Sequence, residues 1–198
     1  MTESTGTITY FQRPGKENTD RTLEIAKQRA EQLALRQVVV ATTGGDTGRK
    51  AAKLFKDLDL VVVTHSAGFS RANFHELSED NREAIVAEGA RLLTCQHAFG
   101  GVNRAVRRKL NTYQLDEIIA YTLRVFGEGM KVACEITLMA ADAGLIRAGE
   151  EVLAIGGTGR GADTAVIVRA ANAQDFFDLR VCEILCKPLL LSAPFPEV

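Results

Sequence analysis

The sequence predicts an α/β fold whose sheet is largely parallel and doubly wound, with helices on both faces. Apolar runs of strand length alternate with segments of helical periodicity along most of the chain. This alternation is typical of parallel strands joined by crossover helices. The Gly-rich link at 157–162 is too short for a crossover, so the strands on either side of it are expected to be antiparallel neighbours.

The first half of the chain contains three predicted strands and three predicted helices. An apolar stripe near the helical period predicts a helix over 18–35, with Asn18 or Thr19 as N-cap. The strands are short continuous apolar runs, as expected for strands that are buried on both faces. In chain order, the remaining elements are expected at 38–41 (strand), 49–56 (helix), 58–65 (strand), 77–90 (helix) and 91–95 (strand).

The second half opens with a predicted loop at 96–112, which carries the basic run "NRAVRRKL". Helices are expected over 115–126 and 130–143. The second of them is apolar on nearly all sides, which predicts that it is buried. Three strands follow, at 151–156, 164–170 and 178–188.

Length and composition indicate a single domain. The 198 residues suffice for a substantial core, which we place at about 36–188, with an N-terminal helical extension at about 11–35. A formal net charge of −1 gives no broad attraction to nucleic acid or to anionic membranes. No apolar run approaches the roughly 20 residues of a membrane span, and the first residues do not resemble a secretory signal.

The four cysteines lie in apolar surroundings and form no Cys-x-x-Cys motif. Free, reduced and mostly buried thiols are the interpretation that we favour. Together with the absence of a secretory signal, they predict a cytoplasmic protein.

The first candidate site is a Gly- and Thr-rich loop between a predicted strand and a predicted helix. Unpaired N–H groups and the helix dipole at such a junction favour an anion, and threonine hydroxyls add donors. Asp46 would repel an anion, unless it is the N-cap of the helix. A plain tight turn without a ligand is the alternative. The loop consists of Thr42, Thr43, Gly44, Gly45, Asp46, Thr47 and Gly48.

Standard nucleotide motifs do not fit this loop. Neither the P-loop pattern nor G-x-G-x-x-G is present, and Thr64, His65 and Ser66 stand where a dinucleotide site needs an acidic residue. NAD binding is therefore disfavoured. Ser66 has no nucleophile-elbow context and is not a hydrolase candidate.

The second candidate site is the segment "GGTGRGADTA" at 156–165. A hairpin turn that requires positive φ explains its glycines without a ligand, but explains Arg160 less well. If the winding direction reverses after the third strand, the fourth strand lies beside the first. The two Gly-rich loops then meet at a topological switch point, where open α/β sheets bind their ligands.

Two histidines follow strand ends that should face the same crevice. His65 ends the second predicted strand and His97 follows the third. A hydrogen-bonded structural role is the alternative for each, and His75 is expected to be solvated. Zinc binding is disfavoured because no pair of ligands has the spacing of a metal site.

Charged residues at two further places are expected to be structural. Lys131, Glu135 and Asp142 share one face of a predicted helix, where a Lys131–Glu135 ion pair at the helix edge is the favoured interpretation. The basic stretch 104–109 is short and lacks interleaved aromatic residues, so we expect a solvated face rather than a polyanion site.

Three segments together resemble the stand-alone proteins related to the C-terminal α/β domain of pyruvate kinase. They are "VVVATTGGDTGRKAAKLF…LDLVVVTHSAGF", "GEGMKVACEITLMAADAGLI" and "EEVLAIGGTGRGADTAVIVRAANAQDFFDLRVCEILCKP", and the resemblance runs from about Phe11 to Pro188. It implies a three-layer α/β/α fold with a mixed five-stranded sheet of order 3-2-1-4-5, strand 5 being antiparallel. In pyruvate kinase, loops at the places of 42–48 and 156–163 bind allosteric sugar phosphates.

The stand-alone relatives look like flavin mononucleotide (FMN) binders, so the resemblance implies FMN with its phosphate in this pocket. The ring would lie toward His65 and His97, with Phe69, Phe74 and Phe99 near it. The first loop departs from the pyruvate kinase pattern through Gly45 and Asp46. The implied cofactor contacts are Thr42, Thr43, Gly44, Gly45, Asp46, Thr47, Gly48, His65, Ser66, Phe69, His97, Gly157, Thr158, Gly159, Gly161, Ala162 and Asp163.

Three functions remain open at this stage: a small FMN-binding flavoprotein or oxidoreductase, a non-catalytic sensor of a phosphorylated metabolite, and a structural subunit. Pyruvate kinase activity is not expected, because a catalytic (β/α)₈ barrel alone needs about 250 residues. The expected partner is a phosphorylated small molecule, with no nucleic acid or membrane. A homo-oligomer is left open, because the apolar helix at 130–143 could reach a partner.

Overall fold

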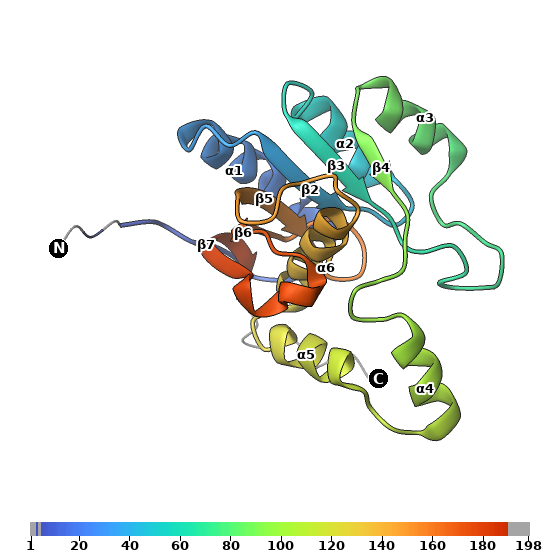
Figure 1. The fold of residues 1–198 in the computed structure, drawn as a ribbon. Helices are drawn as coiled ribbons and strands as arrows, with labels where there is room; N and C mark the ends of the chain where they lie inside the picture. Colours follow the sequence, from blue (N-terminus) through green and yellow to red (C-terminus); the bar gives the residue numbers. More distant parts are fainter. Residues whose placement is uncertain (1–2, 4, 190–198) are drawn as a thin grey trace.

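The computed structural model describes residue 3 and residues 5–189, which form an α/β fold around one mixed sheet (Figure 1). The sheet has seven strands in the order β1-β7-β6-β5-β2-β3-β4. This confirms the predicted α/β class and mixed sheet. The strands are β1 (Thr9–Phe11), β2 (Gln37–Ala41), β3 (Asp59–Val63), β4 (Arg91–Leu93), β5 (Glu151–Gly156), β6 (Thr164–Arg169) and β7 (Arg180–Pro188).

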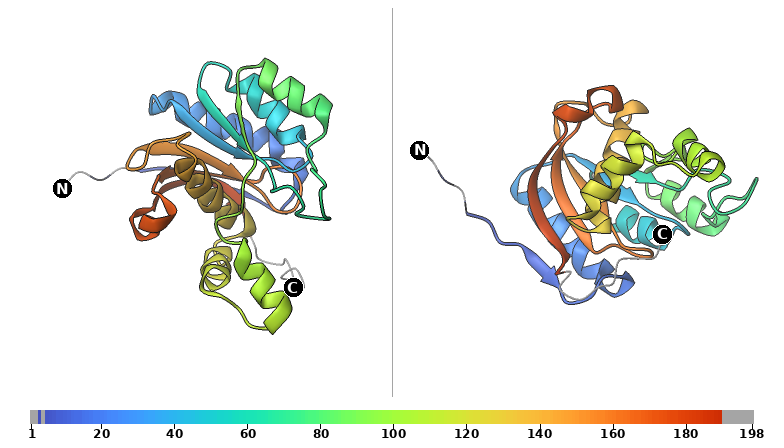
Figure 2. Two further views of the ribbon diagram at one scale, coloured as in Figure 1. Left: turned by 45° about the vertical axis from the view of Figure 1, so that its right-hand side comes forward. Right: turned by 90° about the horizontal axis from the view of Figure 1, so that it is seen from below.

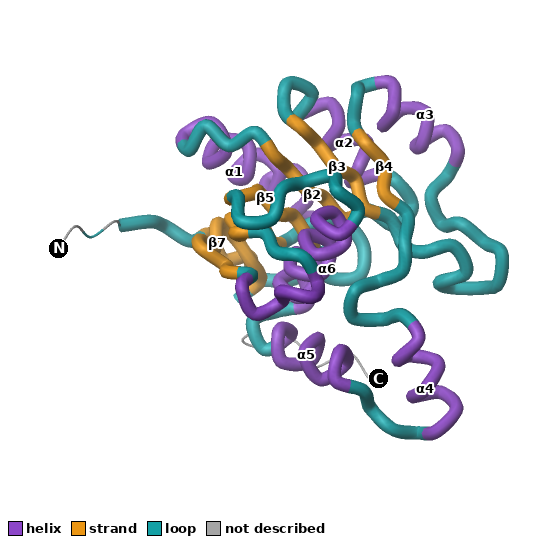
Figure 3. Tube along the Cα trace, in the orientation of Figure 1, coloured by secondary structure: helices purple, strands orange, loops and turns teal. Residues whose placement is uncertain are grey.

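The helices connect these strands and flank the sheet (Figure 3). Their bounds lie within a few residues of the predicted ones, apart from α4 and the two 3₁₀ helices, which were not predicted. The helices are η1 (Lys16–Asn18), α1 (Thr19–Gln32), α2 (Asp46–Leu54), α3 (Glu79–Ala87), α4 (Val102–Leu110), α5 (Leu115–Arg124), α6 (Glu128–Asp142) and η2 (Ala173–Asp178).

The two strand pairings on which a shared site depends are present. β2 pairs in parallel with β5, with Val38 opposite Leu153, and also with β3 on its other side. β5 and β6 are antiparallel, with Gly156 opposite Thr164 at the short link. Because β2, β3 and β5 are parallel neighbours, their carboxyl ends lie at one edge of the sheet, where ligands of open α/β sheets bind.

The predicted number of five strands is wrong. β7 extends the sheet beyond β6 in antiparallel orientation, and β1 pairs in parallel with β7, with Thr9 opposite Cys186. The apolar pattern predicts a strand at 178–188, and this strand is β7. The five-stranded sheet implied by the family resemblance ends at β6 and does not include it. β1 has only three residues, which is too short for periodicity to reveal.

The predicted loop at 96–112 is also wrong, because it contains the helix α4. Its apolar residues Val102, Val106 and Leu110 recur every four positions, which is close to the helical period. No residue of the helix is buried, so these side chains do not pack into the core. Asn111 ends the helix in the left-handed conformation at φ 50°. In the views of Figures 1 and 2, α4 and α5 project away from the body of the sheet.

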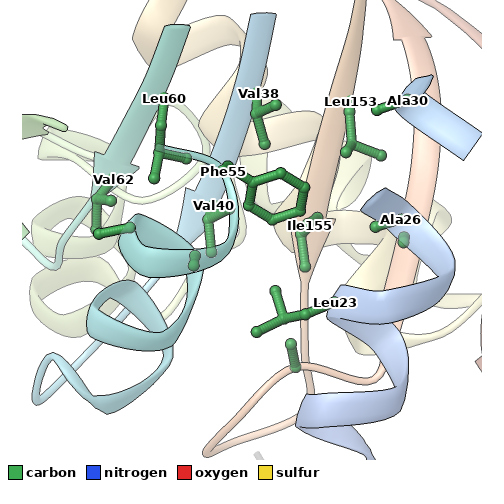
Figure 4. Close-up of a cluster of buried hydrophobic side chains, with 14 of the residues drawn as sticks. Leu23, Ala26, Ala30, Val38, Val40, Phe55, Leu60, Val62, Leu153 and Ile155 are labelled. Carbon is green, nitrogen blue, oxygen red and sulfur yellow. The ribbon is translucent and has the colours of Figure 1, made fainter. Parts of the chain in front are cut away.

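Two apolar layers lie on opposite faces of the sheet. Alternation along β2 places Val38 and Val40 on one face and Val39 on the other. The first face packs against α1 and α2, where Phe55 is fully buried among the strands (Figure 4). The segment expected to be a helical extension, α1, thus contributes to this core. Labelled members of the cluster include Leu23, Ala26, Ala30, Leu60, Val62, Leu153 and Ile155.

The second face packs against α6, most of which is buried, as its sequence predicts. α6 contacts β5, β6 and β2, and α5 packs against it from outside. Its apolar sides are therefore covered within the chain, so its composition is no reason to expect a partner.

The four cysteines are free thiols, as expected, but only Cys134 and Cys186 are buried. Cys95 is half-buried and Cys182 is exposed. Among the described residues, no helix is long and apolar enough to cross a membrane.

Candidate functional site

A pocket of about 1020 Å³ lies at the carboxyl ends of β2, β3 and β5. Its size is at the upper limit for small-molecule sites, which measure roughly 300–1,000 Å³. Its lining includes both polar loop residues and aliphatic side chains. We call the part formed by the two loops the polar end and the part formed by the aliphatic side chains the apolar end. The polar end is lined by Thr42, Thr43, Gly44, Asp46, Thr47, Gly157, Gly159, Arg160 and Gly161.

The loop after β2 leads directly into α2. Gly45 is the N-cap in the left-handed conformation, at φ 110°, so Asp46 is the first helical residue and not the cap. The N–H of Gly48 donates to Oγ1 of Thr42 over 3.2 Å. Within the part of the chain that the structure describes, the N–H groups of Asp46 and Thr47 have no partner. They are unsatisfied donors at a pocket-lining helix end, which favours an anion. The carboxylate of Asp46 also lines the pocket and opposes an anion there, apart from its contact with the amide of Asn81.

Gly45 and Gly48 are needed for packing and do not line the pocket. A Cβ atom at Gly45 would lie 2.4 Å from Cβ of Asn81, and one at Gly48 would lie 2.8 Å from a methyl group of Val62. The amide of Asn81 donates to the carbonyl of Gly44 over 3.0 Å and approaches the carboxylate of Asp46 at 3.3 Å. α3 thereby holds this loop in place.

The side chain of Arg160, in the loop between β5 and β6, reaches the loop after β2. The Nη1 atom of Arg160 lies 3.5 Å from the position that a Cβ of Gly44 would occupy. The turn itself is tight, since a Cβ at Gly157 would lie 2.2 Å from the carbonyl oxygen of Gly161. A Cβ at Gly161 would in turn lie 2.4 Å from Cα of Lys16, so η1 packs against the same loop.

Asp163, Thr158 and Ala162 support this loop and are not among the pocket-lining residues. The carboxylate of Asp163 is fully buried and accepts the N–H groups of Gly15 and Thr158 over 3.0 and 3.2 Å. It also accepts the hydroxyl of Thr164 over 2.9 Å. A carboxylate with these partners fixes the turn to the N-terminal segment.

The apolar end of the pocket is formed by aliphatic side chains. We expected Phe69, Phe74 and Phe99 near a flavin ring, but none of them lines the pocket. Phe99 packs edge-on against Phe176 instead, and Arg71 covers Phe74. The apolar lining consists of Ala41, Val63, Val132, Ile136 and Met139.

His65 and His97 lie together at this end, with ring centroids 5.3 Å apart, and both line the pocket. Phe69 lies against both rings, with centroid distances of 4.0 Å to His65 and 4.9 Å to His97. The guanidinium of Arg104 lies 4.7 Å from the Phe69 ring. Phe69 therefore supports the histidines, and the helix α4 reaches the site through Arg104.

His97 connects the site to α6. Its Nε2 atom accepts the N–H of Ser66 over 3.3 Å, and its Nδ1 atom lies 3.6 Å from Oε2 of Glu135. Glu135 also accepts Nζ of Lys131 at 2.5 Å and the N–H of Phe99 at 3.0 Å. Burial alone would raise the pKa of Glu135, but its close contact with His97 and the charge of Lys131 lower it to about 2.

Two structural interpretations from the sequence need correction. The Lys131–Glu135 pair exists, but it is buried and not at a helix edge, with side chains 9 and 4% exposed. Asp142 is separate and accepts the N–H of Ala173. His75 is not simply solvated, because its Nδ1 accepts the N–H of Leu77 over 3.3 Å.

Sequence reasoning missed several polar residues at the site. Glu76, which binds His65, lies in a polar loop with no distinguishing pattern. Glu135 carried a usable signal, because a charged i, i+4 pair inside an otherwise apolar helix implies a buried pair. The charged pocket-lining residues that were missed are Lys16, Glu17, Asp20, Arg49, Lys50, Lys53 and Glu128.

Comparison with known proteins is consistent with the predicted resemblance. The family model described as "Pyruvate kinase, alpha/beta domain" matches residues 20–168. The crystal structure of Cryptosporidium parvum pyruvate kinase is a similar solved structure, with a TM-score of 0.38 and 13% sequence identity. That match covers 77% of this chain and 22% of the pyruvate kinase chain, so this chain corresponds to about a fifth of its length.

Proposed function

Because the chain belongs to the family of pyruvate kinase alpha/beta domains, we propose that it binds a phosphorylated small molecule in the pocket at the carboxyl ends of β2, β3 and β5. The phosphate lies between the two Gly-rich loops. The organic part lies toward the aliphatic lining and the two histidines. We propose no reaction for this site.

The observation that carries the proposal is the meeting of the two loops. The N–H groups of Asp46 and Thr47, which have no partner among the described residues, supply donors at the start of α2, and Arg160 supplies a cation from the opposite loop. Hydroxyls of Thr43 and Thr47 line the same end. Backbone donors together with one guanidinium make the arrangement that favours a phosphate monoester.

We propose FMN as the ligand. FMN joins a phosphate monoester to a large flat ring system, which matches a pocket lined by polar loops and by aliphatic side chains. Val132, Ile136 and Met139 offer a surface for the faces of the flavin ring, and His65 offers a polar contact at its edge. A dinucleotide fits less well, because Thr64 and Ser66 stand where a ribose-binding carboxylate would be needed.

A non-catalytic sensor of a phosphorylated metabolite is the second candidate. It is favoured by the absence of phenylalanine, tyrosine and tryptophan from the described pocket lining, because such a pocket does not require a flat ring. Both candidates use the same phosphate contacts. They differ in what occupies the aliphatic end, so the absorbance spectrum of the purified chain distinguishes them.

The proposal is tested by titrating the chain with FMN and with riboflavin, following quenching of flavin fluorescence. Riboflavin lacks the phosphate, and each lost charge-assisted hydrogen bond costs about 1.5–3 kcal/mol, so its affinity is expected to be at least about tenfold lower. Arg160→Gln should reduce the affinity for FMN and leave that for riboflavin unchanged. Arg169→Gln, which removes an exposed arginine at the other end of β6, is the matched control.

Equal affinity for FMN and riboflavin would refute the phosphate anchor. Binding of neither flavin, together with binding of inorganic phosphate that is weakened by Arg160→Gln, would support the metabolite sensor. Absence of phosphate binding as well would refute the proposed site altogether.

A further inference from the structure

The two histidines of the pocket differ in how their ring nitrogens are used. Both nitrogens of His97 have protein partners, since Nε2 accepts the N–H of Ser66 and Nδ1 faces the carboxylate of Glu135. His65 has a partner at Nδ1, the carboxylate of Glu76 at 2.6 Å. Among the described residues, no hydrogen bond is made by its Nε2 atom. Of these two histidines, His65 is therefore the one whose Nε2 atom is available to bind a ligand.

The partner of Nδ1 fixes which nitrogen of His65 carries the proton. An ionised carboxylate is only an acceptor, so Nδ1 must donate to Glu76. A neutral imidazole has one proton, and Nε2 is then left with a lone pair. The His65 side chain is 31% exposed and lines the pocket. In its neutral form, this pocket-lining side chain therefore has a hydrogen-bond acceptor at Nε2.

The surroundings of His65 favour the neutral form of its ring. Burial lowers its pKa below the ordinary value of 6.5, which outweighs the hydrogen bond to Glu76. The proximity of His97 lowers the pKa further, whereas the charge of Glu135 on α6 raises it. The other charges near the pair are Lys131, which is bound to Glu135, and Arg104 on α4, which lies over Phe69.

We propose that Nε2 of His65 accepts a hydrogen bond from an N–H or O–H group in the organic part of the ligand. The pocket thereby selects phosphate monoesters that carry such a donor, of which the imide N–H of FMN is one. This inference rests on the proposed function. His97 is a positioning residue, because its hydrogen bond to the N–H of Ser66 fixes the backbone next to His65.

The tautomer is measured first, in the ligand-free chain, because this does not depend on the ligand. Ring ¹⁵N shifts of His65 at pH 7.5 should show a protonated Nδ1 and an unprotonated Nε2. A doubly protonated ring, or a proton on Nε2, would overturn the inference. Glu76→Gln should weaken this preference, because an amide no longer requires a donor at Nδ1.

The contact is tested by comparing FMN with its N3-methyl derivative, which lacks the imide N–H. One lost hydrogen bond predicts about three- to tenfold weaker binding of the methylated compound at pH 7.5. As the pH falls through the lowered pKa of His65, its Nε2 gains a proton and no longer accepts, so this difference should shrink toward unity. Both compounds carry the same phosphate, so titration of the phosphate cancels in the ratio.

His65→Phe keeps a ring against Phe69 and removes the acceptor. It should bring the affinity for FMN down to that for N3-methyl FMN and leave the affinity for inorganic phosphate unchanged. An affinity ratio that does not change with pH or with His65→Phe would overturn the inference while the phosphate site stands. Failure of FMN to bind the unaltered chain would refute FMN as the ligand, and the ring ¹⁵N shifts would still test the proposed acceptor.

Discussion

Arg160 extends its guanidinium to Gly44, so that the link between β5 and β6 meets the link between β2 and α2. Nη1 of Arg160 lies 3.5 Å from the place of a Cβ at Gly44, which is an ordinary van der Waals distance. Since β2 and β5 are neighbours in the sheet, the strand order itself produces this meeting. The absence of a side chain at Gly44 keeps the space between the loops open for a ligand.

Gly44→Val should therefore weaken FMN binding without unfolding the chain. Its backbone does not require positive φ, and the first atom that a Cβ would meet is the end of a flexible arginine. We expect at least about tenfold lower affinity, because loss of one charge-assisted contact is worth roughly 1.5–3 kcal/mol. The measurement is a fluorescence titration with a thermal melt of the same sample.

Gly45→Val provides the contrast. Gly45 has positive φ, and its Cβ would collide with Asn81 and Leu77, so this variant should lose stability by about 1–3 kcal/mol. An unchanged melting temperature for Gly45→Val would show that the loop is less constrained than the structure indicates. Unchanged FMN affinity for Gly44→Val would contradict the role of the loop in binding.

Asp163→Asn should destabilise the β5–β6 link. The fully buried carboxylate accepts hydrogen bonds on both oxygens, and an amide group cannot accept them at its nitrogen. Leaving these donors unpaired predicts a loss of about 1–3 kcal/mol in the free energy of unfolding. Urea denaturation measures it, with the exposed Asp178→Asn as the matched control. Equal stability of the two variants would contradict the assigned role of Asp163.

Glu135→Gln should destabilise the fold by about 3–5 kcal/mol at neutral pH, because it leaves the buried Lys131 without its counter-charge. The pKa of Glu135 falls from 4.5 in the unfolded chain to about 2 in the fold. Its contribution is therefore fully present above 4.5 and is lost as the pH falls toward 2.

The difference in stability between the parent and Glu135→Gln should accordingly be constant from about pH 5 to 7 and shrink below pH 4.5. The double variant Lys131→Met/Glu135→Gln should recover part of the loss, since no unpaired buried charge remains. A double variant no more stable than Glu135→Gln would argue against the ion pair as the cause.

Cys182 should be the thiol that reacts readily with Ellman's reagent in the folded chain. It is exposed, whereas burial raises the pKa of Cys134 to about 12 and that of Cys186 to about 11. The half-buried Cys95 also has a raised pKa and should react slowly. Absorbance should show one fast thiol, which Cys182→Ser removes. A fast phase that survives this substitution would mean that a second thiol is accessible.

The order of elements and the key pairings were predictable from the sequence because they depend on local patterns. Apolar runs marked the inner strands, and the short link at 157–162 required an antiparallel pair, as observed. Two elements were not predicted. The strand β1 is too short to show a periodic pattern, and the helix α4 buries no residue in the core.

The candidate site was predictable to the level of its loops, but not to that of its individual contacts. Glycine marks a tight turn or close packing as readily as a ligand contact, and Gly45 turned out to face Asn81. Asp163 is a predicted ligand contact, and the structure adds that its carboxylate accepts backbone N–H groups. The Glu76–His65 contact spans eleven positions in an irregular loop, where no periodicity indicates which side chains meet.

The central claim, that a phosphate binds between the two Gly-rich loops, is tested most directly by mapping backbone amide shifts in ¹H–¹⁵N spectra of the labelled chain. Adding FMN or inorganic phosphate should shift the amides of residues 43–47 and 157–161, and FMN alone should also shift those near His65. Shifts confined to other parts of the chain, or no shifts with either compound, would contradict the claim.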